Sequence, residues 1–408
     1  MLKGKTLSNY ADLIIEKGVN LQKDQGLTIA CPTQKSEFAH ALTRSAYAHG
    51  AKIVRVRWND EIIDRLAYDH AKTDALTEVP KWIVDERNYL VENNFCYIAI
   101  SAEDPTIFNG VPAEKLASVS KARSKALKKF SDTVMANGIR WCVVSAPTLA
   151  WAKQVFPGAD QPEEELSTAI EKAMRLDSEN PVKEWNIHVE TLNRRARYMT
   201  AKNFEKLVFT SSNGTSLSVG LANDHVWLCA EETAKDGVNF IANLPTEEIF
   251  TAPHKDKVDG KVYSAMPLIY NGQRIDEFWL EFKNGKVVDF GAKLGYEALK
   301  HLLKTDKGTK SIGEVALIGK NSPIAKSGVL FYNTLFDENA SCHLALGKAY
   351  PTTLKDGDKL TKKELLEKGA NDSIEHVDFM IGTLDMNIVG VEKDGTKTNL
   401  FIDGDWVI

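Results

Sequence analysis

The sequence predicts two domains of different class: an α/β domain over residues 1–191 with a mostly parallel, doubly wound-like sheet, and a β-rich α+β domain over residues 192–408. Three observations lead to this prediction. A chain of 408 residues is long for one compact core, because domains typically hold roughly 100–200 residues. The first half alternates strand-like and helix-like segments. The second half is mainly strand-like, with turn dipeptides between the strands.

Four short apolar segments are expected to form the sheet of the first domain. They are LTIAC (27–31), KIVRVRW (52–58), FCYIAIS (95–101) and IRWCVVS (139–145). A helical pattern long enough for a crossover follows each of them, and such alternation predicts parallel strands with helices on both faces. Leu7, Tyr10 and Ile14, closed by Gly18, predict a helix before the first strand. Residues 112–130 read as a later helix with a basic, solvated face.

The second domain is expected to begin after one long helix over residues 181–204, where the pattern changes to strands and hairpins. Asn-Gly and Asp-Gly dipeptides between β-branched or alternating runs favour tight hairpin turns. We expect hairpin turns at four of these dipeptides, Asn213-Gly214, Asn271-Gly272, Asn284-Gly285 and Asp394-Gly395. The change of pattern places the domain boundary near residue 192.

Composition narrows the class of protein. The chain is 43% hydrophobic and 26% charged, as is ordinary for a soluble globular protein. The net charge of −5 offers no basic surface for nucleic acid or an anionic membrane, so small or peptide-like partners are expected. Charged residues interrupt each apolar run of residues 1–20, which predicts neither a signal peptide nor a membrane anchor, and hence a cytoplasmic protein.

The cysteines and the absence of several common motifs exclude further classes of chemistry for this protein. Five widely spaced cysteines without a Cys-x-x-Cys pair predict buried free thiols rather than disulfides or zinc ligands. The sequence contains no Gly-x-Gly-x-x-Gly after a strand, no Walker-type phosphate loop, no His-Glu-x-x-His and no Gly-x-Ser-x-Gly. A doubly wound domain without these motifs does not by itself indicate a function.

Candidate chemistry lies in four segments of the second half. They are ANLPTEEIFTAP with Glu247 and Glu248, SIGEVALIG with Glu314, TLFDENASCHLALGKAY with Glu338, His343 and Tyr350, and SIEHVDFMIG with His376 and Asp378. Taken singly, each has an ordinary explanation, such as exposed loop glutamates, a solvated strand-end glutamate or a hydrogen-bonded core histidine. Adjacent residues of an extended segment face opposite ways, so at most one of Glu247 and Glu248 is expected to point into a site.

The spacing of His376 and Asp378 is the most specific local signal. Residues two apart in a strand lie on the same face, and Val377 and Phe379 would face the other side. A carboxylate beside a histidine suits an ion pair, a catalytic dyad or two ligands of one metal. The spacing alone leaves these three alternatives open.

The four carboxylates Glu248, Glu314, Glu338 and Asp378 are more informative as a set. Bringing them together without positive charge would drive at least one pKa far up, and no lysine or arginine lies close to them in these apolar runs. Two divalent cations would balance the four charges, with His343 and His376 as nitrogen donors. Pairs of metals roughly 3.5–4 Å apart recur in hydrolases.

The segments NLPTEEIFTAP, GEVALIG, TLFDENASCHLALGKAY and HVDFMIG, in this order, resemble the thermophilic aminopeptidase family, the metallopeptidases of the aminopeptidase T and aminopeptidase S type. The N-terminal segments YADLIIEKGVNLQKDQGLTIACP and AYAHGAKIVRVRWND resemble the opening domain of that family. The resemblance therefore covers essentially the whole chain.

The resemblance implies a metal-dependent aminopeptidase that acts on peptides with a free N-terminus. It implies two divalent metal ions per subunit (Zn, Co, Mn or Mg) in the second domain, and a homodimer. Carried over by residue, the metal ligands are Glu248, Glu314 as the bridge, His343, His376 and Asp378. The resemblance implies that Glu338 is a further ligand or a base beside the metals, and that Tyr350 is a weak ligand or a hydrogen-bond donor to the oxyanion.

Two other functions stay open at the level of sequence. A different dinuclear amidohydrolase or a phosphoesterase could use the same ligands. A metal-stabilised peptide-binding protein could hold the same cluster without turnover.

Overall fold

The computed structural model describes residues 2–270 and 273–408, and their contacts divide the chain into two compact units. Unit 1 comprises Met1–Ile187, Glu231–Pro245 and Val329–Leu335. Unit 2 comprises His188–Ala230, Thr246–Gly328 and Phe336–Ile408. The division of the sequence at residue 192 remains a prediction. Unit 1 includes two short segments from the second half of the chain, Glu231–Pro245 and Val329–Leu335. Nothing in their sequence distinguishes them from the strands around them.

The sheet of unit 1 confirms the predicted α/β class. In the described residues it has the order β2-β1-β3-β4 with every neighbouring pair parallel. The strands are β1 (Gly26–Pro32), β2 (Ile53–Asn59), β3 (Cys96–Ser101) and β4 (Trp141–Ser145). Each matches one of the four predicted segments. The strands β1, β3 and β4 read as mainly apolar runs, as buried parallel strands do, whereas the edge strand β2 is less buried and contains Arg55 and Arg57.

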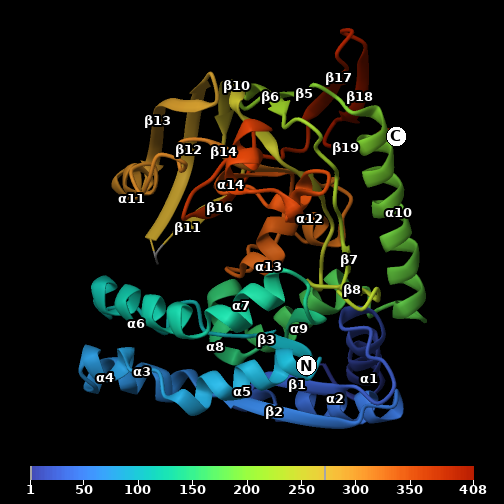
Figure 1. Cartoon of the computed structure of the whole chain (residues 1–408), viewed down its shortest axis with the longest axis vertical. Coiled ribbons are helices and arrows are strands. Elements are labelled where there is room, and N and C mark those ends of the chain that lie inside the picture. Colours follow the sequence, from blue (N-terminus) through green and yellow to red (C-terminus); the bar gives the residue numbers. More distant parts are fainter. Residues whose placement is uncertain (1, 271–272) are drawn as a thin grey trace. The chain divides into compact units, whose positions relative to one another are not determined.

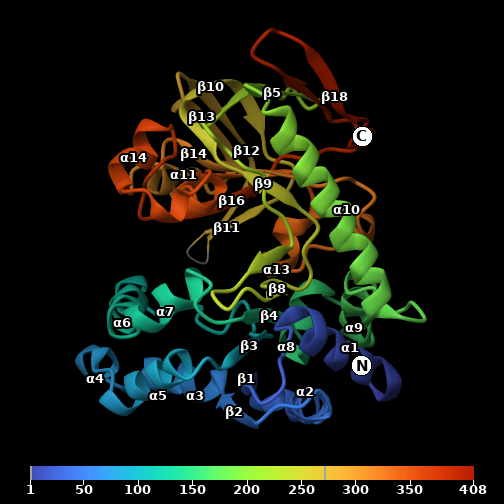
Figure 2. The same ribbon diagram turned by 45° about the vertical axis from the view of Figure 1, so that its right-hand side comes forward.

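Helices follow these strands as the alternation predicted (Figure 1). They are α1 (Gly4–Leu13), α2 (Ser36–Ala48), α3 (Glu61–His70), α4 (Thr73–Thr77), α5 (Lys81–Glu92), α6 (Ala113–Ala126), α7 (Lys128–Met135), α8 (Leu149–Val155) and α9 (Pro162–Ala173). Helices α1 and α2 lie side by side (Figures 1 and 2). The predicted helix over 112–130 is two helices, α6 and α7, that meet at Leu127. The short strands β7 (Glu231–Thr233) and β8 (Asn239–Ile241) pair with each other within the segment Glu231–Pro245 of unit 1.

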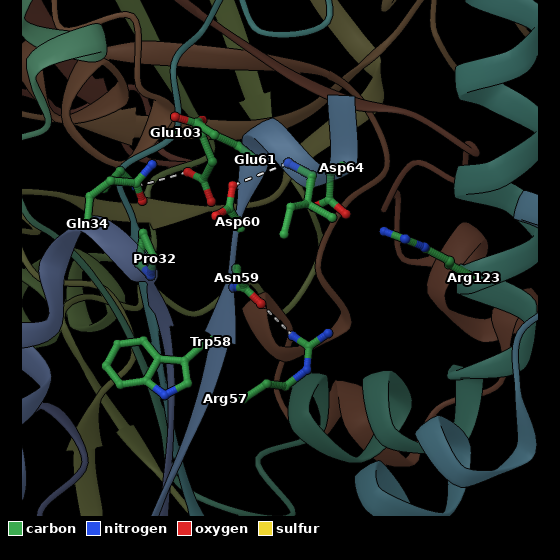
Figure 3. A pocket seen from close by; sticks show the side chains of 12 residues that line it. Pro32, Gln34, Arg57, Trp58, Asn59, Asp60, Glu61, Asp64, Glu103 and Arg123 are labelled. Carbon is green, nitrogen blue, oxygen red and sulfur yellow. Dashed lines mark hydrogen bonds between the residues drawn. The ribbon is translucent and has the colours of Figure 1, made fainter. Parts of the chain in front are cut away.

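A cavity of about 440 Å³ opens at the carboxyl ends of β1, β2 and β3 (Figure 3). Residues that follow each of these strands line it, including Gln34, Asp60 and Glu103. Helix α3 begins at this edge because the side chain of Asp60 accepts hydrogen bonds from the backbone N–H groups of Ile62 and Ile63. The five cysteines are free and buried, as predicted.

A large antiparallel sheet forms the framework of unit 2. Within the described residues its order is β11-β12-β10-β6-β5-β17-β18-β19, with β13 on β12. The strands are β5 (Lys206–Thr210), β6 (Ser216–Leu221), β10 (Pro253–Tyr263), β11 (Leu268–Tyr270), β12 (Gln273–Lys283), β13 (Lys286–Leu294), β17 (Asn387–Val391), β18 (Lys397–Ile402) and β19 (Asp405–Trp406). The predicted long helix is α10 (Pro181–Lys202).

Three of the four predicted turn dipeptides connect antiparallel neighbours, namely β5–β6, β12–β13 and β17–β18. At the β12–β13 turn both Asn284 (φ 49°) and Gly285 (φ 75°) are left-handed, as a primed two-residue turn requires. The fourth dipeptide, Asn271-Gly272, lies outside the described residues.

A smaller antiparallel sheet in unit 2 has the order β16-β15-β14-β9 within the described part of the chain. Its strands are β9 (Ile249–Thr251), β14 (Ile312–Leu317), β15 (His343–Gly347) and β16 (His376–Met380). Phe379 of β16 is 1% exposed and its ring centroid lies 5.7 Å from that of Phe278 on β12. One face of this small sheet is therefore packed on the large sheet, which leaves the other face for polar side chains.

Short helices connect the strands of unit 2. They are α11 (Tyr296–Leu302), α12 (Pro323–Ser327), α13 (Thr334–Asp337, whose first two residues belong to unit 1) and α14 (Lys362–Glu367), together with the 3₁₀ turns η3 (Glu338–Ala340), η4 (Pro351–Thr353) and η5 (Gly357–Lys359). No helix in the described ranges is both long enough and apolar enough to cross a membrane.

Candidate metal centre

Strand register gathers the predicted residues on one face of the small sheet. Across three strands, Glu314 on β14 lies opposite Ala345 on β15, which lies opposite Asp378 on β16. Directly opposed residues of antiparallel strands share a face. The carboxylates of Glu314 and Asp378 therefore lie on either side of the small methyl group of Ala345, which leaves space between the two carboxylates. His343 lies two residues before Ala345, and Gly347, two residues after it, lies opposite His376. The alternation of large and small residues along β15 thus leaves space for the polar groups.

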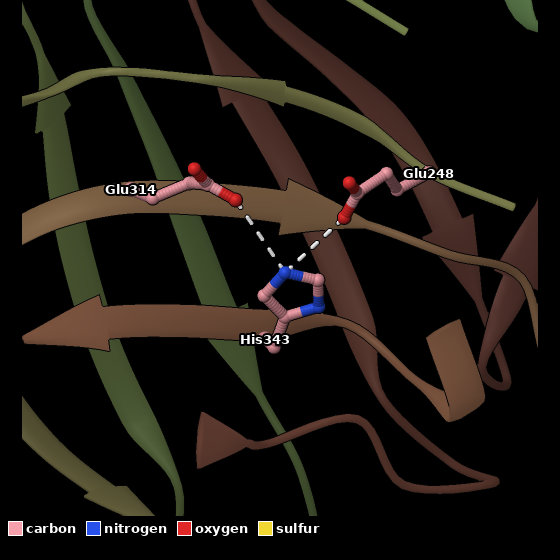
Figure 4. A group of neighbouring side chains, drawn as sticks. All are labelled: Glu248, Glu314 and His343. Carbon is pink, nitrogen blue, oxygen red and sulfur yellow. Dashed lines mark ion pairs between the residues drawn. The ribbon is translucent and has the colours of Figure 1, made fainter. Parts of the chain in front are cut away.

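The polar groups form two clusters that share Glu314. The Nε2 atom of His343 lies 3.2 Å from Oε2 of Glu248 and 3.5 Å from Oε1 of Glu314 (Figure 4). The Nε2 atom of His376 lies 3.7 Å from the other oxygen, Oε2, of Glu314 and 3.3 Å from Oδ1 of Asp378. In each cluster of three residues, one candidate ligand atom per residue lies within 4.8 Å of the others. Glu314 therefore faces both clusters with different oxygens.

Backbone carbonyls orient both imidazoles. Nδ1 of His376 lies 2.7 Å from the carbonyl oxygen of Lys348, and Nδ1 of His343 lies 3.3 Å from that of Ser341. A carbonyl oxygen can only accept, so each Nδ1 carries the proton. Nε2 then faces the carboxylates, and it is the ring atom that can bind a cation once its proton is displaced. Histidines that bind metals are oriented in this way.

Burial sets the charge state of the cluster when it is considered without ions. Burial raises the pKa of Glu314, and the charges of Glu248 and Asp378 raise it further. Burial opposes the protonation of His343, but its hydrogen bonds with Glu248 and Glu314 and the charges of Glu248 and Asp378 raise its pKa well above the usual value. Burial also opposes the protonation of His376, yet contact with Asp378 raises its pKa to about 9. Without ions, protons on the two imidazoles and on Glu314 therefore offset the carboxylate charge, and a bound cation would take their place.

The donor set fits a divalent cation. Oε2 of Glu248 and Oδ1 of Asp378 are buried and lack a well-aligned hydrogen-bond donor, although each faces an imidazole nitrogen. Among the described residues, neither they nor Glu314 nor Glu338 forms an ion pair with lysine or arginine. Buried carboxylate oxygens beside imidazole lone pairs are the ligands that divalent transition metals take.

Glu338 and Tyr350 lie at the edge of this arrangement. Glu338 begins the turn η3, and burial together with the charges of Glu248 and Asp378 holds its pKa well above the usual value. It belongs to neither cluster of three. The Tyr350 ring centroid lies 4.7 Å from that of His376. Burial, followed by the charges of Glu314 and Asp378, raises the Tyr350 pKa, so its hydroxyl keeps its proton at neutral pH.

Glu247 differs from the expectation of an exposed loop glutamate, because it is only 5% exposed. Its carboxylate faces His188 at 3.6 Å, while the neighbouring Glu248 faces His343. The opposite directions of adjacent residues predicted this split, but no motif indicated His188 as the partner. The backbone N–H of Glu247 donates to Oδ1 of Asn339 at 2.7 Å, which ties this segment to the turn that carries Glu338. No sequence signal identified Asn339.

Asp306 anchors the segment that leads into β16. Its carboxylate accepts hydrogen bonds from the backbone N–H groups of Gly308, Thr309 and Ile374 and from the Ser373 hydroxyl, at 2.7–2.9 Å. Burial opposes its ionisation, but the backbone hydrogen bonds from Ile374 and Thr309 lower its pKa overall. The position of His376, two residues after Ile374, depends on this anchor.

We expect Asp306→Ala to lower the free energy of unfolding at pH 7 by about 2 kcal/mol, because several backbone donors lose their acceptor. The folded pKa of Asp306 is depressed, so its contribution is fully present above the unfolded pKa of roughly 4 and is lost as the pH falls through the folded pKa. Urea unfolding from pH 7 downward measures both effects. The control is Asp358→Ala at an exposed position. Equal stability of the two variants would contradict the anchoring role.

Comparison with known proteins adds to this geometry. A family model described as "Thermophilic metalloprotease (M29)" matches residues 3–406. The chain is 42% identical to Aminopeptidase 2 of Geobacillus stearothermophilus over 404 residues and 40% identical to Aminopeptidase AmpS of Bacillus subtilis over 402 residues. Each alignment covers 98% of both chains. The structure of wild-type AmpT from Thermus thermophilus superimposes with a TM-score of 0.93 at 34% identity, covering 99% of both chains.

Proposed function

Since this chain belongs to the thermophilic metalloprotease (M29) family, we propose that it removes N-terminal residues from peptides with the help of two divalent cations held around Glu314. Membership of the family makes it a hydrolase of the metallopeptidase class. The observation that carries the proposal is the division of the two oxygens of Glu314 between the His343 cluster and the His376 cluster.

We assign Glu248, Glu314 and His343 to one cation, and Glu314, His376 and Asp378 to the other. Three protein ligands leave further positions for water and substrate, as catalytic sites do and closed structural sites do not. Imidazole donors favour zinc, cobalt or manganese over magnesium, which takes mainly oxygen ligands.

When bound, the two cations would supply an activated water and polarise the scissile carbonyl. The chain supplies the proton transfers and orients the substrate. Glu338 belongs to neither cluster, so its carboxylate can accept a proton and pass it to the leaving amine. The protonated hydroxyl of Tyr350 can donate to the developing oxyanion, a contact worth about 3 kcal/mol in other enzymes.

The proposal also includes a cellular location and an oligomeric state. Five free, buried cysteines suit a reducing compartment, and this supports a cytoplasmic location. The homodimer rests on the family resemblance, and sedimentation equilibrium of the purified chain measures it.

The activity assay compares L-leucine p-nitroanilide, N-acetyl-L-leucine p-nitroanilide and p-nitrophenyl phosphate. We expect release from the free amine and a rate at least about 100-fold lower from the acetylated compound, because the substrate must present an α-ammonium group. The phosphate ester should not react. Equal rates on both anilides would favour another amidohydrolase. Reaction of the ester alone would favour a phosphoesterase, and binding without turnover a binding protein.

A further inference from the structure

The cavity at the carboxyl ends of β1, β2 and β3 has the position of a ligand site. After β1 the chain crosses over to β2 on one side, and after β3 it crosses over to β4 on the other. Open α/β sheets bind ligands at such a point, outside the carboxyl ends of the strands. The volume of about 440 Å³ falls in the range of small-molecule sites, roughly 300–1,000 Å³. All of its lining residues belong to unit 1, whereas the candidate metal ligands belong to unit 2.

Two guanidinium groups face this cavity (Figure 3). Arg57 comes from the end of β2 and Arg123 from α6. Nη1 of Arg57 donates to Oδ1 of Asn59 at 3.0 Å. Within the described ranges, neither guanidinium forms an ion pair with a carboxylate. Both guanidinium groups are therefore open to a ligand, although the charge of Glu86 favours the protonated form of Arg57.

A third arginine, which does not line the cavity, acts on the charge of Arg57. Arg87 is 6% exposed and lies over the rings of Tyr97 and Phe130, at 5.2 and 5.1 Å from their centroids. Its Nε and Nη1 atoms have no hydrogen-bond partner. Burial, followed by the charges of Arg87 and Arg123, lowers the pKa of Arg57 against the opposing effects of Tyr97 and Glu86. An anionic group placed beside Arg57 and Arg123 would offset the repulsion between these two cations.

Carboxylates line the same cavity. Asp60, Glu61, Asp64 and Glu103 all line it, so the carboxylates outnumber the two arginines. They would repel a multiply charged anion such as phosphate, and the arginines would repel a simple cation. A ligand with a carboxylate at one end and an ammonium at the other satisfies both groups.

Apolar side chains complete the lining. Trp58 and Ile63 are 45% and 65% exposed and both border the cavity. They offer contact area to an aliphatic side chain. We propose that this cavity binds a zwitterionic amino acid or short peptide with an apolar side chain. Arg57 and Arg123 hold its carboxylate, and Asp60 and Asp64 hold its ammonium group.

Isothermal titration calorimetry of the full chain tests this proposal with L-leucine as the probe. We expect one equivalent to bind in Glu314→Gln, because Glu314 does not line the cavity, and at least one in the wild type, whose metal centre can also hold the amino acid. N-acetyl-L-leucine and L-leucinamide, which each lack one charge, should bind about tenfold more weakly or worse. Inorganic phosphate should not bind.

Arginine variants locate the binding. Arg57→Met and Arg123→Met should each raise the Kd for L-leucine about tenfold or more. The matched controls are Arg55→Met on β2 and Lys121→Met on α6, which remove the same charge outside the cavity lining. They should stay within about twofold of the wild type, since exposed charges contribute little at a distance. Arg123 is exposed on its helix, so its variant folds even if Arg57→Met does not.

Several results would overturn the proposal. Phosphate binding in preference to L-leucine would make the cavity an anion site. Loss of L-leucine binding in Glu314→Gln would place the amino acid at the metal centre instead. Equal loss in the control variants, or no heat of binding at all, would remove the cavity as a site for zwitterions.

Discussion

Glu314→Gln is expected to lose peptidase activity by a factor on the order of 10³ or more while the fold is retained. The substitution removes the one carboxylate that both clusters share, at 3.5 Å from His343 and 3.7 Å from His376. It removes one negative charge from each proposed cation site at once. The fold tolerates the change because burial already raises the pKa of Glu314, and a neutral amide of the same shape suits the site without ions.

The measurement is kcat/KM on L-leucine p-nitroanilide, with thermal unfolding in parallel. Glu281→Gln is the matched control, since it makes the same substitution at an exposed position of β12. The control should keep its activity. A Glu314→Gln enzyme with a near-normal rate would remove Glu314 from the bridging role, and an unfolded one would show a structural role instead.

Metal removal is the second change with a large expected effect. Dialysis against a chelator should lower the activity to about 1% or less, and added Zn²⁺ or Co²⁺ should restore it, because the carboxylates and histidines alone supply no activated water. Elemental analysis of the reloaded wild type should find two equivalents per chain. One equivalent would contradict the two-cation proposal, and activity that survives in chelator would contradict metal dependence.

Variants that each remove one proposed ligand show which of the two sites a metal ion occupies. His343→Ala and His376→Ala each disrupt one cluster and leave the other complete. Each should therefore retain about one tightly bound equivalent, while Glu314→Gln should weaken both sites. A His376→Ala protein that still binds two equivalents would exclude His376 as a ligand.

Much of the fold was predictable because local patterns report local structure. In unit 1 the strands β1, β3 and β4 are mainly apolar runs, whereas β2 contains Arg55 and Arg57. Three of the four predicted turn dipeptides lie at hairpin turns. The break of residues 112–130 into α6 and α7 was not predicted, because the helical pattern continues through Leu127. Glu314 was also misjudged as a strand-end residue. It lies inside β14 and is 5% exposed.

By itself the sequence determined the kinds of strands and helices, the placement of His376 and Asp378 on one face, and the membership of a metallopeptidase family. Only the tertiary structure decided that Glu314 faces two histidines with different oxygens, that Glu247 turns to His188, and that Asn339 and Asp306 position the surrounding segments. These features depend on register across strands and on contacts between residues far apart in the chain. Periodicity along one segment carries no information about either, because it reports only which way each side chain faces.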